Sequence, residues 1–418
     1  MSGKRSPLGV IFFTVFVSMV SFGIVIPVLP VYGMQDPFKL SPSMLGSLVG
    51  VFSLVQLVAA PLLGKLSDKI GRKPVLLLSV IGTVVGFLII GRAETVWMLF
   101  LGRIIDGASG GNIATAQACI VDVTAPENRS KAMGMIGAAF GLGFVMGPAL
   151  GGVLSKYSHA MPFYFAAGLS VLNALLIWIK LPETYPVERR QQGVAKINIL
   201  DVFRQGNGSV IGILLLASLL STTGFAFIHL LFSTFCRDRF NWSQTDTGWA
   251  FAYVGLVAVF VQGGLLRRLL HKNIEKQLAG VGALILAISL AWLPFTHTLT
   301  GFLGSCALMA LGNGLLTPTL TGMASRIVSG DVQGRLLGIM AAAGSLGRFL
   351  GPKIAAIPLP ENFSQIDRPL QGPILEQIDK GYEMAFMIGA ILIAASMVCV
   401  LLIRNPSKSN PVAEPVQA

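Results

Sequence analysis

Apolar residues run in long blocks along almost the whole chain, and short polar segments separate the blocks. Each block has roughly the 20 residues that an α-helix needs to cross the hydrocarbon core of a bilayer. We predict twelve spans, at 8–33, 43–64, 74–91, 95–121, 130–155, 161–181, 208–235, 246–267, 276–296, 298–325, 334–357 and 382–403. Because lipid offers the backbone no hydrogen-bond partner, each span should be a helix. The predicted fold class is an all-α polytopic membrane protein.

The twelve spans form two sets of six that resemble each other in sequence. The matching pairs are Phe38/Phe240, Ser41/Ser243 and Gly46/Gly248 at an offset of 202, then Gly143/Gly347 and Gly147-Pro148/Gly351-Pro352 at an offset of 204. Two parallel repeats of six helices are related by a two-fold axis along the membrane normal, with a substrate site between them. We therefore predict a six-helix bundle at 1–181, a central linker at 182–207, a second six-helix bundle at 208–405 and a tail at 406–418.

The loop charges predict the orientation of the chain. Hydrophobic residues make up 53% of the chain and charged residues 12%, whereas soluble proteins have about 25% charged residues. The topology places 21 of the 31 lysines and arginines on one side and 7 on the other. Cytoplasmic loops carry such an excess, so we expect a multi-pass protein of the plasma (inner) membrane with both termini in the cytoplasm. This asymmetry explains the net charge of +12 without a nucleic-acid partner.

The sequence gives no support to an enzyme. It contains no Gly-x-x-x-x-Gly-Lys phosphate loop, and its four histidines and four cysteines have no metal-ligand spacing. We expect no cofactor and no metal, and we read the cysteines as small packing residues. Active transport would then depend on an ion gradient. The expected partners are the bilayer, a small-molecule substrate and protons, and the expected state is a monomer.

Two charges inside the fourth span are the first candidates for chemistry. Arg103 and Asp106 are three residues apart, so they share a helix face and can form an ion pair. Charges at this depth are costly and usually mark function. Asp106 could bind a proton in one conformation and release it in another, with Arg103 adjusting its proton affinity. The alternative is a static ion pair that fixes the helix.

Other polar residues lie in the middle of spans and are candidates to line a cavity. They are Gln56, Asn112, Gln117, His229, Asn313, Thr317 and Arg348. Some of them should only bond neighbouring helices. For Arg348 the alternative is that the side chain reaches toward the interface, and for His229 it is a role in the core.

Two further segments suggest a gate and a pivot. The turn at 64–73 is strongly basic, and Gly64, Asp68, Gly71 and Arg72 within it could form a cytoplasmic gate with Asp122. Simple capping of helix ends is the alternative. In the fifth span, Gly143, Gly147, Pro148, Gly151 and Gly152 allow close helix approach, and the proline should bend the helix.

These segments together resemble the major facilitator superfamily, and within it the tetracycline-efflux-like branch of the twelve-helix drug:H⁺ antiporters. The resemblance rests on the turn at 64–73, on Arg103-x-x-Asp106-Gly107, on the glycine-proline run at 143–152 and on Gly23-x-x-x-Pro27-Val-Leu-Pro30. It covers the whole chain. It implies that the run at 143–152 is the antiporter motif and that Arg103 takes part in proton coupling.

The functional prediction is proton-coupled efflux of small amphipathic organic molecules by alternating access. One departure from the family pattern is that Ser18 stands where many relatives have an acidic residue in helix 1, which leaves Asp106 as the one deep carboxylate in the sequence. With Arg103 and Arg348 present, a neutral or anionic substrate is the more natural one. The alternatives are a proton symporter or uniporter for a sugar or organic anion, and a receptor on a transporter fold.

Overall fold

The computed structural model describes residues 7–125, 128–186, 203, 208–269, 274–328, 331–366 and 368–403. In this part of the chain every regular element is a helix. The first half contains α1 (Leu8–Gly33), α2 (Pro42–Ile70), α3 (Arg72–Gly91), α4 (Val96–Ser109), α5 (Asn112–Val123), α6 (Arg129–Leu154) and α7 (Met161–Lys180). The tail at 406–418 and most of the linker at 182–207 lie outside the described residues.

The second half contains α10 (Gly208–Phe225), α11 (Ile228–Phe240), α12 (Gln244–Phe260), the π-helical stretch η2 (Val261–Leu266), α13 (Arg267–Leu269), α14 (Glu275–Trp292), the short 3₁₀ turn η4 (Leu293–Phe295), α15 (Leu299–Ile327), α16 (Asp331–Ala356) and α17 (Gly372–Leu402). Among the described residues, ten helical stretches are long and apolar enough to cross a membrane. The other two predicted spans are the interrupted α4–α5 pair and α16, which carries Arg335, Arg348 and Lys353. The structure therefore confirms the all-α class and fits twelve spans.

Several predicted spans differ from the helices observed. The predicted turn at 64–73 is mostly helical, because α2 continues to Ile70 and α3 begins at Arg72. The fourth span breaks at 110–111 between α4 and α5, and the seventh breaks at 226–227 between α10 and α11. The last helix begins at Gly372, ten residues before the start of the predicted span at 382. Its polar start is stabilised by a 2.7 Å ion pair between Glu376 and Lys380, one helical turn apart.

The predicted repeat reappears in the helix caps. The Ser41 hydroxyl accepts a hydrogen bond from the Met44 amide at the start of α2. At the start of α12, the Ser243 hydroxyl accepts a hydrogen bond from the Asp246 amide, and the Asp246 carboxylate accepts one from the Ser243 amide. Such caps satisfy amides that have no partner within the helix. Equivalent residues of the two halves thus begin equivalent helices.

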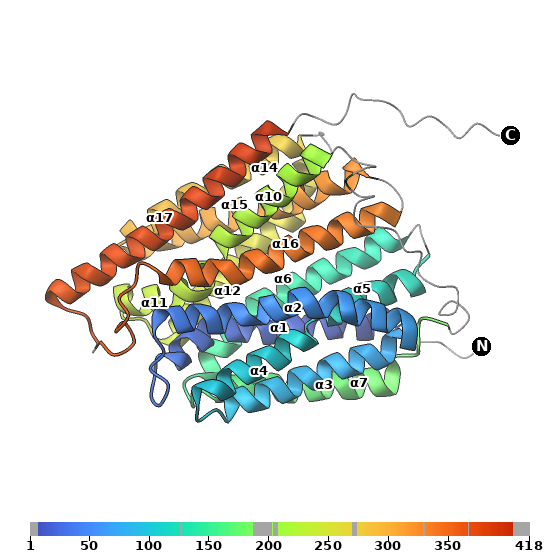
Figure 1. The fold of residues 1–418 in the computed structure, drawn as a ribbon, viewed down its shortest axis with the longest axis horizontal. Helices are drawn as coiled ribbons and strands as arrows, with labels where there is room; N and C mark the ends of the chain where they lie inside the picture. Colours follow the sequence, from blue (N-terminus) through green and yellow to red (C-terminus); the bar gives the residue numbers. More distant parts are fainter. Residues whose placement is uncertain are drawn as a thin grey trace.

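We call the end of the bundle that carries Lys73 the basic end and the opposite end, with the 34–41 loop, the far end. In Figure 1, α3, α4 and α7 lie along one edge of the molecule and α14, α15 and α17 along the other. Helices α2, α6, α12 and α16 lie between these edges. The two halves meet where α6 packs on α12 and α2 packs on α16.

The contacts between the halves are closest toward the far end. A Cβ on Gly46 would lie 2.5 Å from the Pro352 carbonyl oxygen, and a Cβ on Gly248 would lie 2.5 Å from the Pro148 carbonyl oxygen. These two contacts are equivalent under the repeat, which supports the predicted two-fold axis. Only a residue without a side chain permits this approach of two backbones.

Toward the basic end the same helices separate. A Cβ added at Gly134 of α6, Gly263 of η2 or Gly338 of α16 would meet nothing within 4 Å. The halves therefore touch toward the far end and diverge toward the basic end. This conformation is open on the basic side.

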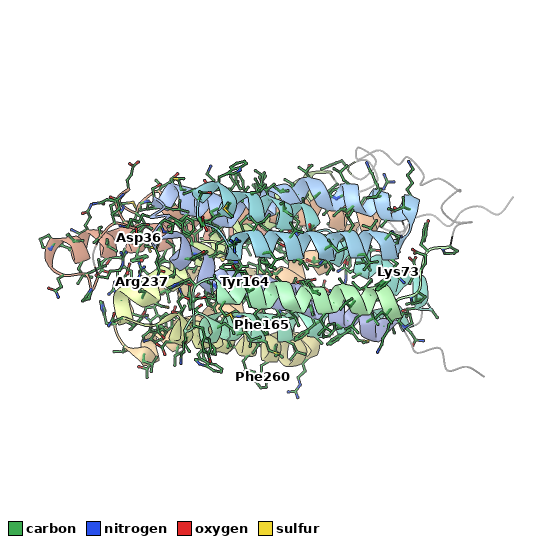
Figure 2. The ribbon with its side chains drawn as sticks, turned by 90° about the horizontal axis from the view of Figure 1, so that it is seen from below. Asp36, Lys73, Tyr164, Phe165, Arg237 and Phe260 are labelled. Carbon is green, nitrogen blue, oxygen red and sulfur yellow. The ribbon has the colours of Figure 1, made fainter. Side chains whose placement is uncertain are left out.

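Apolar side chains cover the flanks of the bundle. Phe260 is 70% exposed and Trp178 is 64% exposed, and Figure 2 shows Phe165 and Phe260 along the side of the bundle. Charged residues lie at its ends, with Lys73 at one end and Asp36 and Arg237 at the other (Figure 2). An apolar flank between charged ends is what a bilayer requires.

Candidate functional site

A large cavity lies between the two halves and widens toward the basic end. Its volume is about 2180 Å³, more than most small-molecule sites offer. All seven predicted cavity residues line it: Gln56, Asn112, Gln117, His229, Asn313, Thr317 and Arg348. Within the described residues no group of histidine, cysteine and acidic side chains could hold a metal ion. Asp106 also lines the cavity.

The predicted ion pair on α4 is present. The Arg103 Nη1 atom lies 3.1 Å from Asp106 Oδ2, and the two side chains are 3% and 9% exposed. Asp106 lines the large cavity, whereas Arg103 lies behind it and borders a second, much smaller void together with His229. The Arg103 guanidinium also stacks 4.7 Å from the centre of the Phe52 ring. The Asp106 carboxylate is thus accessible from the large cavity, whereas the Arg103 guanidinium lies on the side of Asp106 that faces away from this cavity.

The break between α4 and α5 lies one turn from this pair. The Gln56 side-chain amide donates a 2.8 Å hydrogen bond to the Gly110 carbonyl, which lies at the break. On the other side of the break, the Asn112 amide donates a 2.7 Å hydrogen bond to the Ser18 hydroxyl of α1. Gln56 and Asn112 therefore line the cavity and also hold the broken helix against α2 and α1.

In the second half, the predicted polar lining residues lie on α11, α15 and α16. Thr317 donates a 3.1 Å hydrogen bond to the Asn313 side-chain oxygen one turn earlier on α15. Arg348 on α16 donates a 2.8 Å hydrogen bond to the Ser345 hydroxyl. His229 lies in the first turn of α11, just after the break that follows α10. Arg348 and His229 both line the cavity in this conformation.

Four phenylalanines form an aromatic wall that the sequence interpretation missed. Phe22, Phe52, Phe144 and Phe225 all line the cavity. The Phe22 ring centre lies 5.8 Å from that of Phe52 and 6.2 Å from those of Phe144 and His229. Because hydropathy treats lipid-facing and cavity-facing phenylalanines alike, no signal in the sequence distinguished them. The wall offers an apolar, polarisable surface to a ligand.

The predicted gate residues form one cluster. Arg72 forms ion pairs of 2.6 Å with Asp68 and 3.1 Å with Asp122. Gly71 is the single residue between α2 and α3, and its φ of 107° favours glycine. Gly64 and Asp68 line the cavity mouth.

A fourth polar group completes this cluster. The Glu183 carboxylate accepts hydrogen bonds from the Arg72 and Lys73 amides at the start of α3. Glu183 lies at the start of the linker and the other residues belong to the first half, so in this conformation the cluster ties α2, α3 and α5 of the first half to the linker.

The glycine-proline run on α6 contacts both halves. Backbone or Cβ atoms of α1 lie within 3.0 Å of a Cβ placed on Gly143, Gly147 or Gly151, while Gly152 approaches Gln244 of α12. The Pro148 side chain packs on Gly23 of α1. The predicted close packing is therefore observed. The run lies where the two halves meet, which is the position that a pivot requires.

Comparison with known proteins agrees with this geometry. The chain matches the family model described as Major Facilitator Superfamily over residues 11–352. It is 34% identical to the tetracycline resistance protein, class C, of Escherichia coli over 362 residues, which cover 84% of this chain and 89% of that protein. It is 30% identical to multidrug resistance protein 2 of Bacillus subtilis (strain 168), with 82% and 86% of the two chains covered.

Two solved structures share the fold. A bacterial homolog of the human lysosomal transporter Spinster, in an inward-facing and unoccupied conformation, superimposes with a TM-score of 0.80 at 17% identity. The alignment covers 96% of this chain and 97% of that one. The human organic anion transporter MFSD10 has a TM-score of 0.70 at 23% identity, with 96% and 100% covered.

The family match and the tetracycline resistance relatives agree with the motifs, the repeat and the central cavity. The chain is therefore a membrane transporter and not an enzyme. It belongs to the major facilitator superfamily, in the branch that contains the tetracycline resistance proteins.

Proposed function

We propose that this transporter exports small amphipathic organic molecules in exchange for protons, by alternating access. The observation that carries the proposal is the position of Asp106, a carboxylate deep in the bundle that faces the central cavity and pairs with Arg103. The names of the tetracycline and multidrug resistance relatives support export of drug-like molecules.

The proposed exchange uses Asp106 as the proton site. In the conformation described, the cavity connects Asp106 to the basic end, so a proton can leave to the water on that side. The charged carboxylate then pairs with Arg103, which offsets the cost of burying both charges. When the far end opens, Asp106 takes a proton from the opposite side and the pair weakens. Each cycle then carries a proton one way and a substrate molecule the other.

The orientation follows from the loop charges. We place the basic end in the cytoplasm and the protein in the plasma membrane, with both termini cytoplasmic, because positively charged loops are retained on that side. The conformation described then faces inward. We further propose that the α6 run with Pro148 is the pivot and that the cluster of Arg72, Asp68 and Asp122 fixes the basic helix ends as the halves move. The transporter is proposed to act as a monomer.

The test is drug-driven proton movement in proteoliposomes that contain a pH-sensitive dye. Wild-type protein should move protons when a substrate gradient is imposed, and Asp106→Asn should bind substrate but move no protons. Asp36→Asn is the matched control, because that carboxylate lies in an exposed far-end loop and pairs only with Lys39 among the described residues. Equal proton movement by wild type and Asp106→Asn would contradict the proposal.

The alternative is a symporter or uniporter for a sugar or organic anion. Arg348 favours an acidic ligand, because it faces the cavity and its hydrogen-bond partner is the neutral Ser345. Reversing the pH gradient separates the two. Antiport predicts substrate uptake into vesicles that are acidic inside, whereas symport predicts substrate uptake when the outside is acidic. Transport by a uniporter should not depend on the pH gradient.

A further inference from the structure

The second half contains a cation in the cavity that has no carboxylate partner among the described residues. Arg348 lines the cavity, and its hydrogen bond goes to the Ser345 hydroxyl. A guanidinium has five N–H donors, so one neutral hydroxyl leaves most of them available. Arg103 in the first half, by contrast, is matched by Asp106.

The Arg348 side chain cannot reach the water at either end of the bundle. It lies 17 residues after Asp331, which begins α16 at the basic end, so at 1.5 Å per residue it is about 25 Å from that end. Eight residues separate it from Ala356 at the far end, or about 12 Å, which exceeds the reach of its side chain. A charge at this depth persists where it has water or a ligand to bind.

The surroundings of Arg348 include a second arginine and aromatic surface. His229 lies within electrostatic range of both Arg348 and Arg103, so two arginines lie near the closed end of the cavity together with the Asp106 carboxylate. The His229 ring meets the edge of Phe22 at 6.2 Å and of Phe225 at 6.5 Å between ring centres. A ligand that reaches Arg348 therefore lies against aromatic rings.

We propose that the exported molecule is an amphipathic organic anion, whose carboxylate or sulfonate binds Arg348 and whose apolar body packs on the aromatic wall. The inference rests on the proposed function and assigns its substrate class. Arginine suits this role, because its planar fork matches the two oxygens of a carboxylate. The anion also balances the surplus of positive charge left by Arg103 and Arg348 against Asp106.

The test is equilibrium binding to purified, detergent-solubilised protein with a panel of matched aromatic compounds. Each set holds a carboxylic acid, the corresponding neutral amide and the corresponding amine on the same ring system. We expect the acids to bind best. Arg348→Gln should lower the binding affinity for the acids about ten- to hundredfold, as expected for a lost hydrogen bond to a charged group. It should leave the affinity for the amides unchanged.

Two further variants make the result specific. Arg335→Gln removes a cation that lines the same cavity on the same helix, closer to the basic end, and should change acid binding less than threefold. Arg348→Lys keeps the charge without the fork and should bind acids with intermediate affinity. Because binding at equilibrium needs no proton gradient, this result is independent of whether Asp106 couples protons.

Three outcomes would overturn the assignment. Amines or amides could bind as tightly as the acids, no acid in the panel could bind at all, or Arg348→Gln could weaken all three compound classes equally. Loss of proton coupling with acid binding intact would instead count against the proposed function alone.

Discussion

Replacing Gly248 by alanine should shift the transporter away from the conformation described here. Gly248 lies on α12 at the closed side of the cavity, and an added Cβ would lie 2.5 Å from the Pro148 carbonyl oxygen of α6. The obstructing atom is backbone in the middle of a helix, so it cannot move aside without separating the two halves. The alanine therefore destabilises the far-end-closed state specifically.

The magnitude follows from the cost of overpacking. An extra methyl group forced into a close backbone contact costs about 1–3 kcal/mol, which changes a two-state equilibrium about 5- to 150-fold. Gly338→Ala is the matched control, because it adds the same methyl to a helix of the same fold where nothing lies within 4 Å. Both variants gain the same helix propensity, so the difference between them reports the contact.

The assay is the distribution of distances between spin labels at Lys69 on α2 and Gln277 on α14. Both positions are exposed, and they lie at the basic end of the first and second half. The labels are introduced after the four native cysteines have been replaced. Gly248→Ala should move population to shorter distances, which indicates a closed basic end, while Gly338→Ala should leave the population unchanged or move it to longer distances.

Either of two results would contradict this expectation. The Gly248→Ala distribution could be the same as that of wild type, which would show that the contact does not hold the far end closed. Alternatively, Gly338→Ala could cause the same shift as Gly248→Ala, which would trace the effect to helix propensity.

Three other substitutions test separate parts of the account. Arg72→Gln should lower the melting temperature, because it leaves the partly buried Asp122 without this cation. Asp122→Asn in the same protein should restore part of the loss, and additive losses would argue against coupling of the two residues. Phe22→Ala should weaken binding of an apolar ligand about tenfold or more, since an aromatic contact contributes about 1.5–3 kcal/mol. Unchanged affinity would show that the Phe22 ring does not contact the ligand. Ser364→Ala removes the hydrogen bond from the second half to the Leu40 carbonyl of the first, and should raise the far-end-open population about two- to tenfold in the spin-label assay.

The sequence predicted the main architecture because its signals are local or repeated. Span length defines membrane helices whatever their neighbours are. Gly46 and Gly248 match across the repeat because both lie against a proline carbonyl of the opposite half, which a side chain would prevent. The spacing of Arg103 and Asp106 sufficed to predict their ion pair, since three residues place them on one helix face.

Other features depend on tertiary packing, which hydropathy does not report. The break after Ser109 looks like any glycine pair within an apolar run, and its partner Gln56 is 54 residues away in sequence. Phe22 and Phe225 face a cavity, but equally apolar residues face lipid, so periodicity could not assign them. The helical start of α17 at Gly372 is polar, and a hydropathy window therefore places the beginning of the span too late.

The central claim is that Asp106, at the cavity wall, exchanges a proton for each substrate molecule that leaves. The most direct measurement is proton release on substrate binding to purified protein in weakly buffered solution. We predict that wild type, equilibrated at a pH low enough to protonate Asp106, releases protons in proportion to bound substrate and that Asp106→Asn binds without release. Proton release that persists undiminished in Asp106→Asn, or its absence in wild type, would contradict the claim.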